Sequence, residues 1–269
     1  MHPLFQKLPD GISEFTFANI YLFRNIHHYR ITRLPDDLFA ITGKDDDKPF
    51  FMLPFGLPDK SLLEELFSKF VSMKCVSEQQ SNVLAQMGYY VEEDRDNFDY
   101  IYSRADLVNL NGRQMHTRKN LLNSFLKKHN GIAKPLLDEY TDDALKVLEQ
   151  WRQARGDAGD YAACREGLEQ MYELQLCGGI YYVSERPVGF TLGEENALGT
   201  SYVIHFEKAV DVDTYKGLYQ FINQTFSSFL PEKYETVNRE QDLGRPGLRR
   251  AKESYNPIGF VKKFRATKR

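Results

Sequence analysis

The order of helix-like and strand-like segments is the feature that most limits what this chain can fold into. Apolar residues recur at helical spacing in some segments and form short β-rich runs in others. In the second half these patterns predict two helices, a β-hairpin, a strand, a helix, a strand, a helix and a strand, over residues 141–156, 160–176, 180–194, 200–209, 215–230, 234–240, 247–255 and 260–266. Helices and strands are mixed along the chain, so we expect an α+β fold.

The first half repeats this order more loosely. Its patterns predict a helix, a hairpin, a helix, a strand, a helix and a strand, over residues 13–28, 29–56, 58–71, 73–76, 77–88 and 89–103. The succession resembles the GNAT acyltransferase fold, in which a central sheet splays open and the acyl donor enters the gap. The resemblance implies tandem GNAT-like domains, each a mixed central sheet flanked by helices. We place them at residues 1–111 and 112–269, with the main candidate site in the second.

Composition excludes several classes of protein. No run of 18 apolar residues occurs, so we expect no membrane span. The first residues, MHPLFQKLPDG, lack a basic stretch followed by an apolar one and predict no signal peptide. Cys75, Cys164 and Cys177 are too few and too scattered for a disulfide framework or a zinc cluster. We therefore expect a cytoplasmic protein without a metal site, and the alternating acids of residues 94–99 are typical of a solvated strand.

Positive charge is concentrated in two segments. Between Leu107 and Leu137 there is no acidic residue, and residues 239–269 carry ten Lys or Arg against three Asp or Glu. Such segregation indicates either an anionic partner such as a nucleic acid or two solvated helical faces. The candidates for RNA binding, on a basic helix predicted over residues 112–130, are Arg118, Lys119, Lys127 and Lys128.

A short polar constellation lies on the strand predicted over residues 200–209. Alternation along a strand would place His205 and Glu207 on one face and Lys208 on the other. An acid beside an imidazole is a common general-base arrangement, so His205 and Glu207 are candidate catalytic residues that could share a proton. The alternative is a polar edge-strand face, or a histidine whose hydrogen bonds are satisfied in the core. Lys208 is a candidate substrate-binding residue.

The next predicted helix begins where CoA-dependent GNAT enzymes carry a glycine-rich sequence that binds pyrophosphate. The corresponding positions are Thr214, Gly217 and Tyr219, so only the central glycine matches and the tyrosine would crowd a pyrophosphate. This departure makes acetyl-CoA a less favoured cofactor. Asn223 and Gln224 follow on the same helix and are either ligand-binding amides or surface residues.

The stretch VNREQDLGRPGLRRAK, residues 237–252, combines charges of both signs with a Gly-Pro turn. It begins at the end of a predicted strand and leads into a predicted helix. Surface ion pairs contribute only about 0–1 kcal/mol each, so a cluster this dense favours a site over a scaffold. Two interpretations stay open, an internal ion network and a site for the charged ends of a zwitterion such as an aminoacyl group. The substrate-binding candidates here are Asn238, Arg239, Asp242, Arg249 and Lys252, and Glu240 is a catalytic candidate.

Several of these motifs together resemble a known family. The stretch NREQDLGRPGLRRAKESYNP, with HFEKA, VGFTLGE, DRDNFDYIY and PFGLPDK, resembles the bacterial family defined by the C-terminal domain of phosphatidylglycerol lysyltransferase. Its better-known relatives, the lysylphosphatidylglycerol synthases and the Fem aminoacyltransferases, move an amino acid from aminoacyl-tRNA to an acceptor. The resemblance implies aminoacyl-tRNA as donor and tRNA as partner. Because the sequence shows no counterpart of the synthases' membrane-embedded flippase portion, we expect a small-molecule or peptide acceptor.

We therefore expect an acyl- or aminoacyltransferase in which an amine or hydroxyl attacks an ester carbonyl. His205, Glu207 or Glu240 would accept the proton, and a cation of residues 239–252 would stabilise the developing negative charge. Tyr255 lies near the position at which GNAT enzymes place a tyrosine that protonates the leaving group, or else it packs as an ordinary tyrosine. Two alternatives remain, a non-catalytic sensor of an amino-acid-like molecule and an acyl-CoA-dependent N-acetyltransferase.

Overall fold

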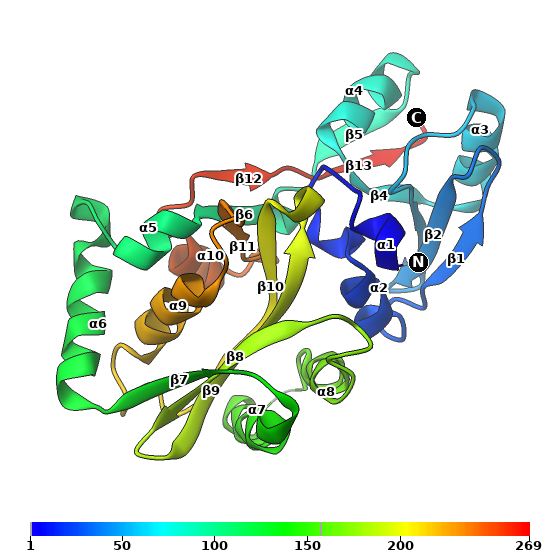
Figure 1. Cartoon of the computed structure of the whole chain (residues 1–269). Helices are drawn as coiled ribbons and strands as arrows, with labels where there is room; N and C mark the ends of the chain where they lie inside the picture. Colours follow the sequence, from blue (N-terminus) through cyan, green and yellow to red (C-terminus); the bar gives the residue numbers. More distant parts are fainter. Residues whose placement is uncertain (1, 157) are drawn as a thin grey trace.

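Two mixed β-sheets flanked by helices organise the chain in the computed structural model, which describes residues 2–156 and 158–269 (Figure 1). The α+β fold expected from the sequence, with two mixed sheets and flanking helices, is confirmed. The helix α2 (Phe17–Phe23) lies between the sheets, and both ends of the chain lie on the side of the smaller sheet.

The smaller sheet has the strand order β1-β2-β3-β4-β13-β5. These strands span Arg30–Arg33, Phe39–Asp45, Lys48–Met52, Ser72–Val76, Phe264–Thr267 and Tyr90–Glu93. Strands β3 and β4 run parallel, and the other neighbours are antiparallel. The helices of this half are α1 (His2–Phe5), α3 (Lys60–Lys69) and α4 (Glu78–Gln86). Phe67 of α3 and Leu84 of α4 pack in one apolar core with Phe51 of β3, because helical spacing puts the apolar residues of each helix on one face.

The larger sheet has the order β12-β6-β11-β10-β9-β8-β7. Its strands span Gly259–Val261, Asp99–Ser103, Thr236–Asn238, Ser201–Ala209, Arg186–Asn196, Cys177–Val183 and Gly131–Pro135. Among the described strands of this sheet, only β10 and β11 are parallel neighbours. Their pairing joins Ser201–Val203 to Thr236–Asn238, so residues 204–209 of β10 have no partner among the described strands on that side. The sheet therefore splays open beyond residue 203.

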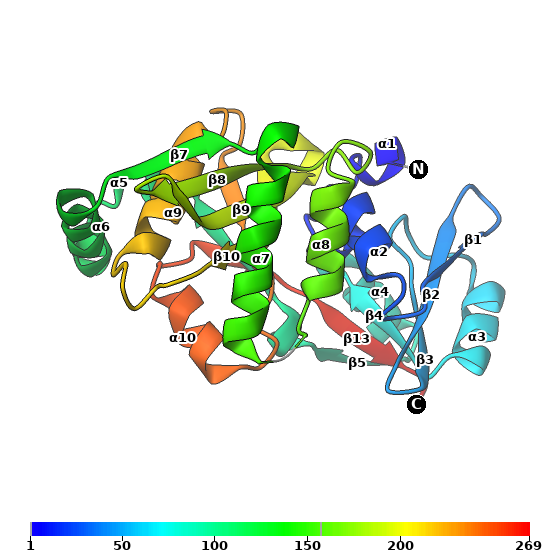
Figure 2. The ribbon, with the colours of Figure 1, turned by 90° about the horizontal axis from the view of Figure 1, so that it is seen from below.

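Helices cover both faces of the larger sheet (Figure 2). Two helices lie on one face, α7 (Thr141–Arg155) and α8 (Tyr161–Glu169), and on the opposite face α9 (Leu218–Phe229) lies beside α5 (Arg104–Asn109) and α6 (His116–Lys128). Helix α10 (Pro246–Glu253) follows β11 at the open edge. Short 3-10 helices span Ser13–Phe15, Arg95–Asn97, Arg113–Met115, Asp138–Tyr140 and Ala197–Gly199.

Five local predictions were wrong. The closing strand predicted over 260–266 is two strands, β12 and β13, in different sheets. Asp99, expected on a solvated strand, is fully buried. The single strand predicted over 89–103 is two strands in different sheets, because a 3-10 turn at Arg95–Asn97 interrupts it. Of the helix predicted over 13–28, only α2 is α-helical. The chain turns back after α2, and the Lys44 N–H donates to the His27 carbonyl at 2.8 Å. The helix predicted over 160–176 ends at Glu169 and continues as turns.

The chain crosses between the sheets at points that the predicted domain division does not follow. Strand β6, which precedes residue 112, belongs to the larger sheet. Strand β13, near the C-terminal end of the sequence, belongs to the smaller sheet. Each sheet is thus built from both segments, and the division into residues 1–111 and 112–269 stays a prediction.

A buried ion cluster lies where the chain makes the second crossing. Lys263, between β12 and β13, has a side chain that is 1% exposed and donates to Asp99 Oδ1 at 2.7 Å and to Glu14. The backbone N–H of Ser13 donates to the other oxygen of Asp99 at 2.9 Å. Burial opposes the charged form of Lys263, but the charges of Asp99 and Glu14 raise its pKa above the usual value. Lys263 is therefore an ammonium enclosed by carboxylates of other segments.

We expect Lys263→Met to reduce the free energy of unfolding at pH 7 by about 3–5 kcal/mol, because it leaves buried carboxylates without their cation. Lys262 supplies a matched control, since it is 44% exposed and pairs with Glu93 at 3.3 Å. Lys262→Met should cost about 0–1 kcal/mol. Urea denaturation of both variants measures the difference, and equal losses would contradict the role assigned to Lys263.

Candidate functional site

A cleft of about 790 Å³ opens where β10 diverges from β11. Its walls come from β10, the end of β11, α9 and α10, and it extends to the helices α7 and α2 on the other face of the sheet. Of the residues predicted from sequence, the cleft is lined by Arg118, His205, Glu207, Lys208, Asn223, Arg239, Glu240, Lys252 and Tyr255. Those outside its lining are Lys119, Lys127, Lys128, Gln224, Asn238, Asp242 and Arg249.

His205 differs from the arrangement predicted for it. The pairing of β10 with β9 skips this residue, which makes it the extra residue of a β-bulge and breaks the alternation on which the shared face with Glu207 was based. Its Nε2 lies 2.9 Å from Glu194 on β9, and its Nδ1 lies 2.7 Å from Glu240. No hydrogen bond or ion pair joins His205 to Glu207 in the described part of the chain. The predicted proton-sharing pair is therefore replaced by a carboxylate–imidazole–carboxylate cluster.

The two carboxylates determine the charge of His205. Its side chain is 1% exposed, and burial by itself lowers the pKa of an imidazole. The hydrogen bonds to Glu194 and Glu240 outweigh burial and raise the pKa of His205 to about 10. At neutral pH the ring is therefore an imidazolium that donates from both nitrogens, and it has no lone pair with which to accept a proton.

Glu207 is paired with Arg239. The guanidinium of Arg239 donates to both oxygens of Glu207, at 3.0 and 3.1 Å, and the amide of Asn223 donates to one of them at 3.2 Å. The side chains of Glu207 and Arg239 are 12% and 15% exposed. Both oxygens of Glu207 thus accept from Arg239, which follows β11, and one also accepts from Asn223 of α9.

Glu240 occupies the left-handed region of backbone space, with φ of 57°. The buried side chain of Asn238 holds this conformation, because its Oδ1 accepts from the Glu240 N–H at 2.8 Å. The Oε1 atom of Glu240 faces His205 and also accepts from Asn19 at 3.4 Å. Its Oε2 atom has no hydrogen-bond partner among the described residues. Glu240 therefore combines a fixed orientation with one carboxylate oxygen that is available to a ligand in the cleft.

Lys252 reaches the cleft from α10. It donates to the carbonyl of Arg239 and, at 3.0 Å, to the carbonyl of Glu240. Burial, followed by the nearby charge of Arg239, lowers the pKa of Lys252 to about 8. An ammonium has three N–H donors, so at neutral pH one donor remains after the two carbonyls are satisfied.

Part of the 237–252 stretch forms the internal ion network that the sequence left open as an alternative. Asp242 is fully buried and accepts from Arg249 at 2.8 and 2.9 Å, from Arg95 at 3.3 Å and from the Tyr100 hydroxyl at 2.7 Å. Burial opposes ionisation, but these donors, Arg249 first among them, hold the pKa of Asp242 below its usual range. Asn238 donates to Asp99 and to the Gly11 carbonyl. The side chains of Asn238, Asp242 and Arg249 therefore form hydrogen bonds and ion pairs within the protein.

Lys208 lies on the other side of β10. Its ammonium contacts both oxygens of Asp160 at 2.7 Å and lies 4.0 Å from the centroid of the Trp151 ring. Asp160 and Trp151 line the cleft and were not predicted as site residues. No sequence signal identified Asp160, since an acid before a helix also suits an ordinary helix start.

Three further candidates have structural contacts. The hydroxyl of Tyr255 accepts from Gln220 at 3.0 Å, and its ring lies against the guanidinium groups of Arg118 and Arg239, at 4.9 and 5.2 Å. Arg118 also donates to the Ser254 hydroxyl. The amide of Gln224 donates to the Val108 carbonyl at 3.1 Å, outside the cleft.

Gly217, the one residue that matched the CoA pattern, has a packing explanation. It adopts φ of 97°, and a Cβ atom there would lie 2.3 Å from the carbonyl oxygen of Leu121 on α6. Helix α6 therefore packs closely against the start of α9. Tyr219 in the first turn of α9 lines the cleft instead.

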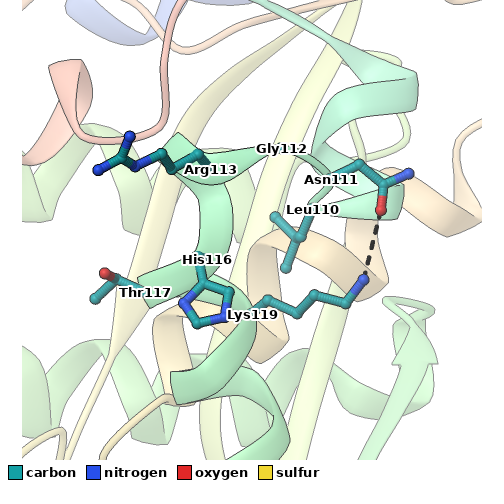
Figure 3. A pocket seen from close by; sticks show the side chains of 7 residues that line it. All are labelled: Leu110, Asn111, Gly112, Arg113, His116, Thr117 and Lys119. Atoms are coloured by element: carbon teal, nitrogen blue, oxygen red, sulfur yellow. Dashed lines mark hydrogen bonds between the residues drawn. The ribbon is translucent and has the colours of Figure 1, made fainter.

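The remaining RNA-binding candidates lie on α6. Lys127 and Lys128 are exposed in its last turn. Lys119 lines a second cavity, of about 710 Å³, at the turn between α5 and α6 (Figure 3). In the described residues no group of three or more His, Cys, Asp or Glu side chains is placed to hold a metal ion, and no helix has the length and apolar character needed to cross a membrane.

Comparisons with known proteins agree with this architecture. The family model described as phosphatidylglycerol lysyltransferase, C-terminal, matches residues 5–267. No curated protein matches the sequence. A solved structure of a conserved protein of unknown function from Bacteroides thetaiotaomicron is 26% identical, with a TM-score of 0.89 over 100% of this chain and 96% of that one.

Two more distant structures share the fold. The C-terminal domain of a putative lysylphosphatidylglycerol synthetase from Agrobacterium fabrum is 12% identical, with a TM-score of 0.68 over 99% of this chain and 92% of its own. A structure of FemX is 10% identical, with a TM-score of 0.63 over 98% of this chain and 94% of its own.

The buried imidazolium predicts a pH dependence of stability. Because the pKa of His205 is about 10 in the folded chain and 6.5 is its ordinary value, its contribution is complete below pH 6.5 and declines as the pH rises. The free energy of unfolding should fall by up to about 2 kcal/mol between pH 6.5 and 8. Above pH 8 the lowered pKa of Lys252 acts in the opposite direction, because the folded state releases that proton more readily.

Denaturant unfolding at several pH values measures this decline, with His205→Gln as the control that lacks the titrating group. The difference between the two chains isolates His205 from other ionisable groups. An NMR titration provides a second measurement that does not require the variant to fold. An imidazole that loses its proton near pH 6.5 would contradict the assignment.

Proposed function

The chain belongs to the phosphatidylglycerol lysyltransferase C-terminal family, and we propose that it is an aminoacyltransferase whose reaction takes place in the cleft between β10 and β11. In this reaction an acceptor amine or hydroxyl attacks the carbonyl carbon of an aminoacyl ester. A bond forms between the acceptor atom and that carbon, the ester C–O bond breaks, and the proton of the acceptor passes to the leaving hydroxyl of the donor. The donor that family membership favours is aminoacyl-tRNA.

The observation that carries the proposal is the pairing of one available donor with one available acceptor in the cleft. Lys252 has an N–H that neither carbonyl uses, and Glu240 has an oxygen without a partner in the described chain. The two groups are adjacent, because Lys252 donates to the backbone carbonyl of Glu240 itself at 3.0 Å. A tetrahedral intermediate needs these two functions close together, a donor for its oxyanion and an acceptor for the proton of the nucleophile.

Lys252 is the group that we assign to the oxyanion. Its ammonium is held by two backbone carbonyls, so its position does not depend on the substrate. Donors that are fixed before the reaction stabilise developing charge without a cost of reorganisation. Arg239, which lies close enough to lower the pKa of Lys252, adds positive charge to the same region.

Glu240 is the group that we assign to proton transfer. The imidazolium of His205 fixes one of its oxygens at 2.7 Å, and the other has no hydrogen-bond partner among the described residues, in a residue that lines the cleft. His205 is in this proposal a positioning residue, since its ring is already protonated at neutral pH. Glu207 and the Oδ1 atom of Asn223 are assigned to the amino group of the donor. Glu207 is the other carboxylate of this part of the cleft, and its oxygens keep further acceptor sites after they accept from Arg239 and Asn223.

A transfer assay tests the function directly. Lysyl-tRNA or alanyl-tRNA carrying a labelled amino acid would be incubated with small amines, peptides and phosphatidylglycerol vesicles as acceptors. We expect label on one acceptor class and release of uncharged tRNA. Label from acetyl-CoA in place of aminoacyl-tRNA would make the protein an N-acetyltransferase, and thermal stabilisation by free amino acids without any transfer would make it a sensor.

The proposed proton acceptor gives a sharper test. Glu240→Gln should lower kcat by about 10²–10⁴-fold, which is the usual contribution of a general base, with a smaller effect on KM. Glu253→Gln is the matched control, since this exposed acid next to Lys252 does not line the cleft. Lys252→Met should lower kcat by about 10²–10³-fold, as expected for loss of one oxyanion donor. Normal turnover in Glu240→Gln would exclude the assigned role.

A further inference from the structure

No step of the proposed reaction uses one end of the cleft. This end is lined by residues of α2 and the turn after it, of α7, and of the segment before α8: Phe23, Ile26, His27, Trp151 and Asp160. Glu207 and Asn223, which are assigned to the donor, reach the cleft from the side of α9, whereas α7 and α8 cover the other face of the larger sheet (Figure 2). The end near α7 and α8 is therefore left for the acceptor.

The smaller sheet holds His27 in this end of the cleft. Its Nδ1 lies 2.7 Å from Asp45 of β2, and Asp45 also pairs with Lys74 of β4. Its ring stacks on that of Tyr29, with 5.1 Å between the centroids. Its carbonyl oxygen approaches Gly43 so closely that a Cβ atom there would lie 2.8 Å away. The smaller sheet thus fixes both the ring and the backbone of His27.

The Nε2 atom of His27 is left for a ligand. The hydrogen bond from His27 outweighs burial and, with Lys74, holds the pKa of Asp45 below its usual range. An ionised carboxylate only accepts hydrogen bonds, so Nδ1 carries the hydrogen and Nε2 of the neutral ring keeps a lone pair. Nε2 has no hydrogen-bond partner among the described residues, and the side chain is 31% exposed. His27 is therefore a fixed hydrogen-bond acceptor in the lining of the cleft.

His27 lies well away from the reacting groups. Asn19 of α2 donates to Glu240 at 3.4 Å, and Phe23 follows Asn19 by about one turn, or roughly 6 Å. The rings of Phe23 and His27 are 6.4 Å apart. The distance from Glu240 to Nε2 of His27 is therefore on the order of 10 Å. An extended peptide covers this distance in about three residues, at roughly 3.3–3.6 Å each.

The walls beside His27 suit an uncharged chain. Lys208, whose side chain is 8% exposed, forms an ion pair with Asp160 that is neutral in sum. The half-buried ring of Trp151 and the side chain of Ile26, which is 51% exposed, add apolar surface. A peptide group has no net charge and carries a donor and an acceptor, so it matches such walls better than a phosphate does.

We propose that His27 determines acceptor specificity, and that its Nε2 accepts a hydrogen bond from an amide N–H of a peptide acceptor, about three residues from the attacking amine. The inference rests on the proposed function, because it identifies the acceptor of that reaction. Asp45 and Lys74 are positioning residues, and an apolar side chain of the peptide contacts Ile26 and Trp151. The smaller sheet, which supplies no reacting group, thereby selects the acceptor.

Matched acceptors test this hydrogen bond. Transfer from aminoacyl-tRNA would be measured with Ala-Ala-Leu amide, with the same peptide methylated on the nitrogen of its third residue, and with glycinamide. Methylation removes the N–H that His27 accepts, so it should raise KM by about 2–10-fold, the usual value of one neutral hydrogen bond. Glycinamide is too short to reach His27 and serves as the internal control.

His27→Phe should raise KM for the unmethylated peptide by the same factor and leave the other two acceptors unchanged, because they never make the bond. The phenyl ring keeps the stacking on Tyr29, and Asp45 keeps Lys74. His28→Asn is the matched control, since His28 is exposed, lies outside the cleft lining, and has a φ of 53° that Asn tolerates. An equal loss with all three acceptors, or no loss with the unmethylated peptide, would overturn the inference.

Fluorescence separates this inference from the proposed function. Trp151 is the only tryptophan in the sequence and lines this end of the cleft, so its emission reports peptide binding without a donor. The unmethylated peptide should bind about 2–10-fold more tightly than the methylated one, and His27→Phe should remove the difference. Such binding in a protein that transfers nothing would refute the proposed function and leave the acceptor site standing. Transfer to phosphatidylglycerol vesicles alone, at the same rate in His27→Phe, would overturn the peptide site and keep the proposed function.

Discussion

The enclosure of Lys263 is the interaction on which the arrangement of the two sheets depends. A charged ammonium is tolerated in the interior only where charge and hydrogen bonds compensate it, and its compensating groups, Asp99 and Glu14, come from β6 and from the segment before α2. Lys263 itself leads into β13 of the smaller sheet. Desolvation makes such a cluster weak evidence for net stability. Its effect is to specify how the two sheets meet, since any other packing would leave a buried charge without its partner.

The same cluster extends into the site. Asp99 accepts from Asn238 at 3.2 Å, and Asn238 in turn holds the N–H of Glu240, while Glu14 accepts from Gln241 at 2.8 Å. The left-handed backbone of Glu240 is disfavoured for a residue with a side chain and persists because these bonds over-determine it. The turn that orients Glu240 toward His205 is therefore fastened to the junction between the sheets. A substitution at that junction would alter the orientation of Glu240 although it replaces no residue of the cleft.

The sequence predicted the α+β fold and most of the element order, because both depend on local periodicity. Many of its candidate site residues line the cleft, and their roles stay predictions. It could not predict the partner of His205. Strand alternation pointed to Glu207, and one extra residue in β10 redirects the ring to Glu194 and Glu240, which are 11 and 35 residues away. Similarly, no local rule divides the charges of residues 237–252 between the cleft and the interior. That division depends on Arg95 and Tyr100, which lie 147 and 142 residues before Asp242 in the chain.

Repulsion between like charges connects the geometry of the cleft with the reaction proposed for it. The pKa of Lys252 is lowered by burial and by Arg239, so the surroundings of this residue disfavour its ammonium form. An oxyanion beside Lys252 relieves that repulsion, and it exists only after the acceptor has attacked, so the relief favours the transition state over the bound substrate. The cleft thus carries an unfavourable charge that the proposed oxyanion compensates, which is the pattern expected when stability is given up locally for function.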